Sequence, residues 1–160
     1  MTVSVGDKIP SAKIKTMTAD GMSEVDTAEF FAGRKVVMFA VPGAFTPTCS
    51  AKHLPGFIEN VADLKGKGVD EIACISVNDA FVMDAWGKSQ NAGSDIAMLA
   101  DGNGDFTKAM GLEMDGSGFG LGTRSQRYAL VADNGTITTL NVEQPGAFDV
   151  SRAEAILAAL

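Results

Sequence analysis

The chain has 160 residues, of which 46% are hydrophobic and 21% are charged. These values are ordinary for a globular protein and exclude a disordered or collagen-like chain. The length predicts a single domain spanning residues 1–160. The formal net charge of −7 argues against a basic patch that binds a phosphate backbone, so we expect no nucleic-acid partner.

Two short segments bear on the location of the protein. The central apolar run, Val36–Val41, is far shorter than the about 20 apolar residues that a membrane-spanning helix needs. The start of the chain, Met1–Lys8, lacks the apolar stretch of a secretory signal. We therefore expect no membrane association and a cytoplasmic location.

Two cysteines and one histidine are too few for a disulfide scaffold or a closed zinc site, so no metal is expected.

The first half of the chain predicts short strands and helices in alternation. Asp20-Gly21 marks a hairpin turn between two short extended stretches, and Asp26 begins a short helix. Residues 36–41 are continuously apolar, which is typical of a central strand buried on both faces. A helical pattern runs from position 54 to position 64 and should be kinked at Pro55, which lacks a backbone N–H.

The second half repeats this alternation and adds an antiparallel hairpin. Strands are predicted at residues 71–77, 96–100, 127–132 and 136–142, and helices begin at Asp79, Asp105 and Ser151. The last helix opens with a capping box, Ser151–Glu154, and the glycine-rich residues 116–122 are predicted to form a mobile loop. This order resembles the thioredoxin-like arrangement, an α/β fold with a mixed central β-sheet flanked by helices on both faces.

Cys49 lies between the first buried strand and the first turn of a helix, in the segment Val41–Ser50. A helix N-terminus carries unpaired N–H groups and the positive end of the helix dipole, so a thiolate there is stabilised and reactive at neutral pH. Pro42 and Pro47 stiffen the loop, and Thr46 supplies a hydroxyl that can donate to and accept from a small polar substrate. By position alone a buried, inert cysteine is an equal alternative, and the loop residues favour a reactive thiol.

The pattern Pro42-x-x-x-Thr46-x-x-Cys49 resembles the active-site motif of the peroxiredoxins. The longer string Val41–Ser50, followed by Lys52–Phe57, is similar to the type-five, or plant type-II, subfamily. The likeness covers essentially the whole chain, with further matching strings at Ile75–Asp79, Phe81–Met83, Leu99–Gly102 and Gly122–Ser125. The resemblance implies a thiol peroxidase that reduces hydrogen peroxide and organic hydroperoxides without a cofactor.

The resemblance also implies four catalytic residues. Cys49 matches the peroxidatic nucleophile, Thr46 and Pro42 match two other motif positions, and the fourth is an arginine at the start of the late strand. Arg124 and Arg127 both lie there; we assign the role to Arg127, which leads directly into the strand, and expect Arg124 to be a solvated loop charge. A fixed cation stabilises the thiolate and orients the peroxide oxygens. The reaction leaves a sulfenic acid on Cys49, which a thiol must reduce.

Cys74, within the predicted strand 71–77, has two interpretations. It is either a buried strand residue or a resolving cysteine that forms a disulfide with Cys49, which would require local unfolding. Animal members of the subfamily carry their resolving cysteine close to the C-terminal helix, whereas residues 141–151 here contain none. This favours a one-cysteine cycle with an external reductant, either glutathione with glutaredoxin or thioredoxin, and leaves a resolving role of Cys74 possible.

The remaining predictions concern the surroundings of the thiol. His53 follows Cys49 by four residues and should line or support the pocket; the pair also leaves open a cysteine hydrolase, although no orienting Asn or Asp is evident. Phe45, Phe81 and Phe119 lie in loops or at a helix start near one edge, through which type-five relatives form dimers, so we expect a homodimer. A redox sensor that uses the same sulfenic acid is the main alternative to a peroxidase.

Overall fold

The structure is a computed structural model that describes residues 1–160. Its strands are β1 (Lys13–Thr18), β2 (Gly21–Asp26), β3 (Lys35–Ala40), β4 (Glu71–Ser76), β5 (Ala97–Ala100), β6 (Glu113–Asp115), β7 (Thr123–Ser125), β8 (Tyr128–Asp133) and β9 (Thr136–Val142). Its α-helices are α1 (Thr27–Phe31), α2 (Leu54–Glu59), α3 (Val61–Gly66), α4 (Ala80–Ser89), α5 (Asp105–Met110) and α6 (Ala153–Ala159).

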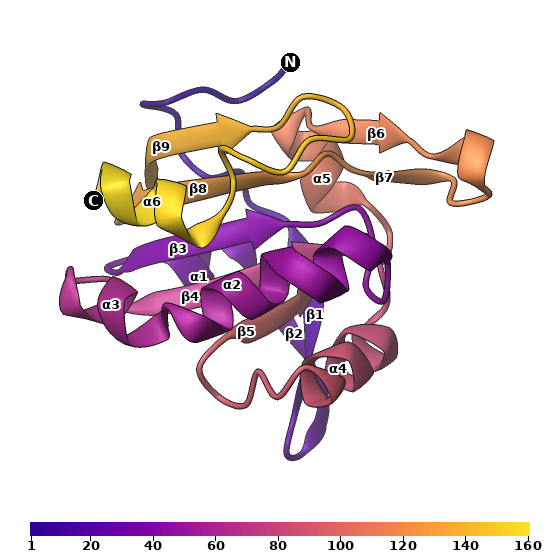
Figure 1. The fold of residues 1–160 in the computed structure, drawn as a ribbon, viewed down its shortest axis with the longest axis horizontal. Helices are drawn as coiled ribbons and strands as arrows, with labels where there is room; N and C mark the ends of the chain where they lie inside the picture. Colours follow the sequence, from indigo (N-terminus) through magenta and orange to yellow (C-terminus); the bar gives the residue numbers. More distant parts are fainter.

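Seven strands form one mixed sheet in the order β2-β1-β5-β4-β3-β8-β9 (Figure 1). β3, β4 and β5 are parallel to one another, and the other neighbouring pairs are antiparallel. β6 and β7 form a separate two-stranded ribbon that projects from one side of the molecule (Figure 1). None of the helices is long and apolar enough to cross a membrane.

The seven-stranded sheet separates the hydrophobic core into two halves, and β3 contributes side chains to both. Its side chains alternate between the faces of the sheet, as the pleat of a strand requires. Val37 and Phe39 pack into the half that α2, α3, α4 and α6 cover, and Val36 and Met38 pack into the half that α1 and α5 cover (Figure 1). The continuous apolar run is therefore explained by burial on both faces, and the thioredoxin-like α/β expectation is confirmed.

Local signals place most element boundaries where we expect them. The Asp20-Gly21 turn joins β1 and β2 in an antiparallel hairpin. The carboxylate of Asp26 accepts hydrogen bonds from the backbone N–H groups of Ala28 and Glu29 and caps α1, and the carboxylate of Asp79 caps α4 in the same way. These predictions are confirmed because each depends only on neighbouring residues.

The helix after the Cys49 loop is more irregular than the predicted single kink. Residues Cys49–His53 form a π-helical turn, in which the N–H of Leu54 donates to the carbonyl of Cys49. Pro55 lies in the first turn of α2, directly after the π-helical turn, and has no N–H to donate to a carbonyl of that turn. The chain then bends a second time at Asn60, which separates α2 from α3. The wider π-helical turn thus replaces the sharp kink that the sequence predicts.

Near the site, one sequence prediction is wrong and a second is incomplete. The Ser151–Glu154 capping box does not form: α6 begins after Arg152 without a side-chain cap, and the hydroxyl of Ser151 donates to Glu143 instead. The glycine-rich segment 116–122 is not simply a loop, because β6 and β7 pair on either side of it and Ser117–Phe119 form a 3₁₀ turn. The capping box fails because Glu143 accepts the hydroxyl of Ser151, and the ribbon is missed because its strands are only three residues long.

Candidate active site

The β3–β8 pair brings the predicted nucleophile and cation to one edge of the sheet. β3 and β8 are antiparallel neighbours, with Ala40 opposite Tyr128, so the end of β3 and the start of β8 coincide. Arg127 immediately precedes β8, and Cys49 opens the π-helical turn that follows β3. The Nη2 of Arg127 donates to the Sγ of Cys49 across 3.2 Å. The structure therefore places together the two residues that the sequence pairs.

Three hydrogen bonds hold the loop before Cys49. The carbonyl of Pro42 accepts from Nη1 of Arg124 at 3.3 Å, and the N–H of Ala44 donates to the side chain of Asn78 at 2.9 Å. The hydroxyl of Thr46 donates to the carbonyl of Gly43 at 2.6 Å. Because this bond uses the only hydroxyl proton of Thr46, the oxygen lone pairs remain free to accept from a substrate O–H.

His53 contacts the guanidinium nitrogen of Arg127 that does not contact the thiol. Its Nδ1 lies 2.8 Å from Nη1 of Arg127, and its Nε2 lies 2.9 Å from the carbonyl oxygen of Ser151. Because a guanidinium only donates and a carbonyl only accepts, Nδ1 must be the acceptor and Nε2 must carry the proton. Burial, together with the charge of Arg127, lowers the pKa of His53 to about 3, so the ring is neutral at physiological pH.

This geometry argues against the hydrolase alternative. A cysteine hydrolase needs an imidazole that takes the thiol proton, but both ring nitrogens of His53 are occupied by Arg127 and Ser151. His53 instead packs its ring between Phe39 and Phe148, with centroid distances of 4.8 and 5.1 Å. The expectation that His53 supports the pocket agrees with this placement.

Arg124 is not the solvated charge that we expected. Its side chain is half-buried, and it donates to the carbonyls of Leu121 and Pro42 at 2.9 and 3.3 Å. A Cβ added at Gly43 would lie only 2.8 Å from Nη1 of Arg124, so glycine permits the close approach. The long-range contact with Pro42 explains the error, because a loop sequence gives no signal of it. Arg124 thus braces the backbone of the Cys49 loop.

Cys74 lies in the interior of β4, opposite Phe39 of β3. Its thiol belongs to the same half of the core as Cys49, and both cysteines are reduced and fully buried. Burial raises the pKa of the Cys74 thiol well above its usual range, the nearby Cys49 raises it further, and Arg127 opposes this shift. Cys74 is therefore a protonated thiol at neutral pH and a poor nucleophile.

Glu143 and Ser151 are residues of the site that sequence reasoning missed. Glu143 directly follows β9, is 7% exposed, and accepts from the N–H and the hydroxyl of Ser151 at 2.9 and 2.7 Å. Burial opposes its charge, but these donors and the N–H groups of Asp149 and Val150 outweigh burial and lower the pKa of Glu143. The only sequence signal for this contact is Ser151, which the local pattern instead predicts as a helix cap.

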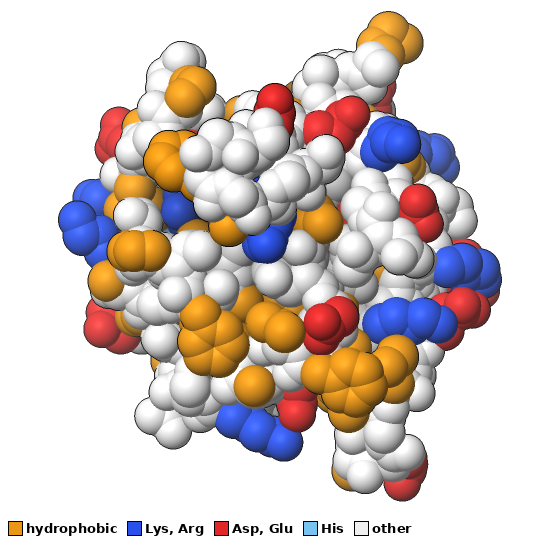
Figure 2. Space-filling view, turned by 90° about the vertical axis from the view of Figure 1, so that its right-hand side faces the viewer, with side chains coloured by type: hydrophobic (Ala, Val, Ile, Leu, Met, Phe, Trp, Pro, Cys, Tyr) orange, Lys and Arg blue, Asp and Glu red, His pale blue; other side chains and the backbone are white.

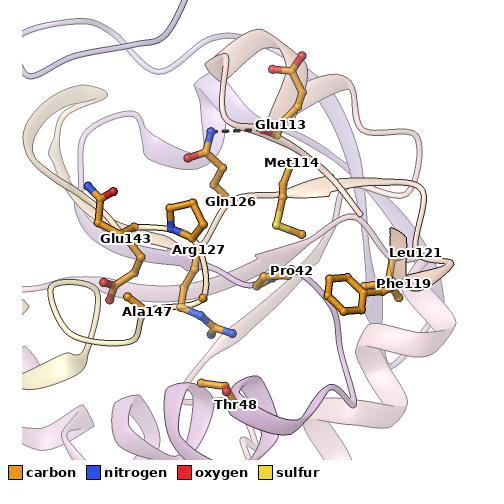
Figure 3. A pocket seen from close by; sticks show the side chains of 13 residues that line it. Pro42, Thr48, Glu113, Met114, Phe119, Leu121, Gln126, Arg127, Glu143 and Ala147 are labelled. Carbon is orange, nitrogen blue, oxygen red and sulfur yellow. Dashed lines mark hydrogen bonds between the residues drawn. The ribbon is translucent and has the colours of Figure 1, made fainter. Parts of the chain in front are cut away.

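A pocket of about 520 Å³ opens above Arg127 (Figure 3). The guanidinium of Arg127 points toward the helix that carries Thr48, and Pro42 lies on the same floor (Figure 3). Met114, Phe119 and Leu121 give one side of the pocket an apolar wall. Gln126, Glu143 and Gln144 contribute polar groups. Cys49 is fully buried and, like Thr46, is not among the residues that line the pocket, but its neighbours Thr48 and Arg127 are.

Three phenylalanines are exposed around this region: Phe45 (56%), Phe81 (63%) and Phe119 (87%). Phe45 has a backbone φ of 63°, a left-handed conformation that is unusual for a residue other than glycine. Figure 2 shows several exposed hydrophobic side chains on the face that carries the Cys49 loop, the start of α4 and the tip of the β6–β7 ribbon. None of the three rings tucks into the core of its own chain.

A mixed sheet of this order, with a thiol at a helix start against a half-buried arginine, is the arrangement of the thioredoxin-like thiol enzymes. The Redoxin family model matches residues 4–157. Peroxiredoxin-2E-2, chloroplastic, from Oryza sativa subsp. japonica is 57% identical over 164 residues, covering 99% of this chain and 73% of that protein. Peroxiredoxin-2C from the same organism is 52% identical, covering 99% of this chain and 98% of that protein.

The solved structures give the same result. Reduced Prx3 of Vibrio vulnificus in complex with H₂O₂ has a TM-score of 0.96 and 60% sequence identity, with 99% of each chain covered. The chain belongs to the peroxiredoxins of the Redoxin family and to their type-five, plant type-II subfamily. It is a thiol peroxidase, an enzyme that reduces peroxides.

Proposed function

We propose that Cys49 is the peroxidatic nucleophile and that Thr46, Pro42 and Arg127 complete the catalytic site. The observation that carries this assignment is the 3.2 Å contact between Nη2 of Arg127 and Sγ of Cys49. Arginine keeps its charge at all physiological pH values, so it favours the thiolate over the thiol. Pro42 supplies the floor of the pocket and the carbonyl that Arg124 holds.

The reaction follows from these contacts. The Cys49 thiolate attacks the terminal oxygen of a hydroperoxide ROOH, an S–O bond forms and the O–O bond breaks. The sulfur is oxidised to the sulfenic acid Cys49–SOH, and the leaving RO⁻ takes a proton from water to give ROH. Thr46 accepts from the hydroperoxide O–H through its free lone pairs, and Arg127 stabilises the charge that develops on the leaving oxygen.

We propose both hydrogen peroxide and organic hydroperoxides as substrates. The pocket is far larger than one peroxide molecule needs, and its Met114, Phe119 and Leu121 wall offers apolar contact to an organic group. The relative from Vibrio vulnificus was solved with H₂O₂ bound, which supports the smaller substrate. Cumene hydroperoxide and hydrogen peroxide, compared by kcat/KM, test the two substrate classes.

We propose that an external thiol completes the cycle, from glutathione with glutaredoxin or from thioredoxin. One reduced thiol displaces water from Cys49–SOH to give a mixed disulfide, and a second thiol releases reduced Cys49 as the other partner is oxidised. The protonated and buried state of Cys74 supports this route, because an internal resolving thiol would have to leave β4. Cys74 is therefore dispensable in our proposal.

We also propose a homodimer that covers the three exposed phenylalanines. Hydrogen bonds join the segments that carry them: the N–H of Ala44, beside Phe45, donates to the side chain of Asn78 before α4, and Arg124 of β7 donates to the carbonyl of Pro42. These bonds place the three segments next to one another, and large exposed apolar side chains grouped in this way are common at interfaces.

Two free cysteines fit a reducing compartment, which supports our expectation of a cytoplasmic location. Cell fractionation tests that location.

The deciding experiment measures peroxide consumption with excess reductant, supplied in turn as glutathione with glutaredoxin, as thioredoxin with its reductase, and as dihydrolipoamide. We expect many equivalents of peroxide to be consumed per chain with at least one of these donors. A redox sensor would consume one equivalent and stop. If no donor supports more than one turnover while Cys49 is fully oxidised by peroxide, the sensor replaces the peroxidase.

A further inference from the structure

The backbone places Glu143 beside Arg127. The N–H of Glu143 donates to the carbonyl of Arg127 at 2.9 Å, so the two residues face each other where β8 begins and β9 ends. Both side chains line the pocket (Figure 3). They do not form a salt bridge, because the carboxylate turns toward the following loop. A buried carboxylate next to the catalytic cation, but not paired with it, requires an explanation.

The carboxylate closes the loop 144–150 onto the end of β9. Its Oε2 accepts from the N–H of Asp149 at 2.6 Å, the N–H of Ser151 at 2.9 Å and the hydroxyl of Ser151 at 2.7 Å. Ser151 gives its hydroxyl to this cluster although it stands where a cap of α6 is expected, and α6 is left without a side-chain cap. The geometry of Ser151 is thus set by Glu143 rather than by the helix.

A chain of hydrogen bonds leads from Ser151 to the thiol. The carbonyl of Ser151 accepts from Nε2 of His53, which turns the lone pair of Nδ1 toward Nη1 of Arg127. With Nη1 occupied, Arg127 presents Nη2 to Cys49. Phe148 belongs to the same loop. Its ring centroid lies 5.9 Å from Cζ of Arg127 and 5.1 Å from the ring centroid of His53. The loop thus touches Arg127 both directly and through His53.

We propose that Glu143 is a positioning residue for the peroxidase reaction. By holding Ser151, it fixes the orientation of His53 and hence the direction in which Arg127 points its free N–H at Cys49. This inference rests on the roles proposed above for Cys49 and Arg127. In this proposal Glu143 does more than hold the loop 144–150 in place. It also controls how strongly Arg127 stabilises the Cys49 thiolate.

The test compares Glu143→Ala with Glu143→Gln, which keeps one acceptor oxygen, and with Glu154→Gln, which makes the same change at an exposed site on α6. All variants carry Cys74→Ser, so that Cys49 is the single thiol. Two quantities are measured: the rate constant for H₂O₂ in single turnover, and the pH profile of Cys49 alkylation. We expect Glu143→Ala to react roughly 10- to 100-fold more slowly and its alkylation profile to move to higher pH. Glu143→Gln should be intermediate, and the Glu154→Gln control should match the parent.

The decisive comparison repeats Glu143→Ala in an Arg127→Ala background. If Glu143 acts through Arg127, its loss should change the rate by less than about twofold there. Equal fold losses in both backgrounds, or a lower melting temperature with an unchanged alkylation profile, would show that Glu143 only stabilises the fold. Should Glu143→Ala not fold, Glu143→Gln and Ser151→Ala take its place, and a parental rate and profile in both would overturn the proposal.

The same experiment separates this inference from the proposed function. A slow Arg127→Ala variant together with a normal Glu143→Ala variant would remove Glu143 and leave the catalytic assignment intact. An Arg127→Ala variant that reacts at the parental rate would overturn both.

Discussion

Cys49 and Cys74 are equally buried, but the regions that hold them are built differently. Cys74 lies within a strand that pairs with β3 on one side and β5 on the other, surrounded by apolar side chains. Cys49 begins a π-helical turn after an irregular loop and accepts a hydrogen bond from Arg127. Neither thiol lines the pocket above Arg127, but Thr48, the residue before Cys49, does, whereas neither neighbour of Cys74 in the chain does.

The contrast teaches that exposure is a poor guide to the reactivity of these thiols. What differs is the surroundings of each thiol: Cys49 lies at a helix start in contact with a cation, which stabilises a thiolate, whereas burial in β4 disfavours the thiolate of Cys74. Reactivity is therefore a property of the element and its long-range partners. The following experiments test this difference, from the largest expected effect to the smallest.

Replacing each cysteine should separate the two regions completely. We expect Cys49→Ser to abolish peroxide reduction, because serine offers no comparable nucleophile at neutral pH. Cys74→Ser should retain most of the activity with glutaredoxin, while burial of its hydroxyl lowers the free energy of unfolding by about 1–3 kcal/mol. Steady-state peroxide consumption and denaturant titration measure the two effects. Equal loss of activity in two folded variants would refute the one-cysteine cycle.

The two arginines test whether direct contact with the thiol matters more than bracing of its loop. Arg127→Ala should slow the reaction with peroxide by roughly 100-fold, because it removes the donor that touches Sγ and meets the developing charge. Arg124→Ala should have a much smaller effect, since it loses only contacts with the Leu121 and Pro42 carbonyls. Single-turnover rates give the comparison. If Arg124→Ala is the more damaging variant, the assignment of the catalytic arginine is wrong.

His53 makes the stability of the Cys49 region depend on pH below neutrality. The folded-state pKa of His53 is about 3, below its value of about 6.5 in an unfolded chain. Between these values the unfolded state binds a proton that the folded state does not, so the free energy of unfolding falls as the pH falls from 6.5 toward 3. The contribution is complete above pH 6.5 and declines by up to about 1.4 kcal/mol per pH unit below it.

A His53→Gln variant isolates this contribution. The amide can accept from Arg127 and donate to Ser151 as the neutral ring does, but it does not titrate. Denaturant unfolding between pH 6.5 and 4.5 should show a shallower loss of stability in the variant than in the parent. Parallel pH profiles would mean that His53 is protonated in the folded protein.

The smallest effect concerns the surface beside the Cys49 loop. We expect Phe45→Ala to weaken self-association roughly tenfold or more, since an exposed aromatic ring at an interface is a common energetic anchor. Alanine is preferred to glycine because glycine would also free the backbone at this left-handed position. Sedimentation over a concentration series measures the change, with Val5→Ala, at another exposed apolar site, as the control. If the parent chain stays monomeric at high concentration in both redox states, the proposed homodimer is wrong.

The elements that the sequence predicts well are those with strong local patterns. The continuous apolar run predicts β3, and the mostly apolar strings at residues 71–77 and 127–132 predict β4 and β8, because burial on both faces favours apolar residues. The β6–β7 ribbon was not predicted, since its strands are three residues long and flank a glycine-rich segment. Short strands carry too little pattern to distinguish pairing from a loop.

The site divides in the same way. Cys49 and Thr46 lie in one loop whose sequence already indicates chemistry, and Arg127 follows from the resemblance to a family. Glu143 and Ser151 could not be predicted, because their roles depend on a contact across the loop and on His53, 98 residues earlier than Ser151. The local sequence favours a helix cap at Ser151. In the structure its hydroxyl donates to Glu143 instead, because a buried carboxylate without hydrogen-bond donors is costly.

The antiparallel pairing of β3 with β8 also bears on how the chain acquires activity as it folds. The two residues that meet at the thiol are separated by 78 positions, and only this strand pair brings them together. Contacts between distant parts of a chain form late, because closing the intervening loop costs entropy before any contact offsets it. Intermediates with only local helices and hairpins therefore have an unassisted thiol. During refolding, recovery of peroxidase activity should follow β3–β8 docking and report on completion of the sheet.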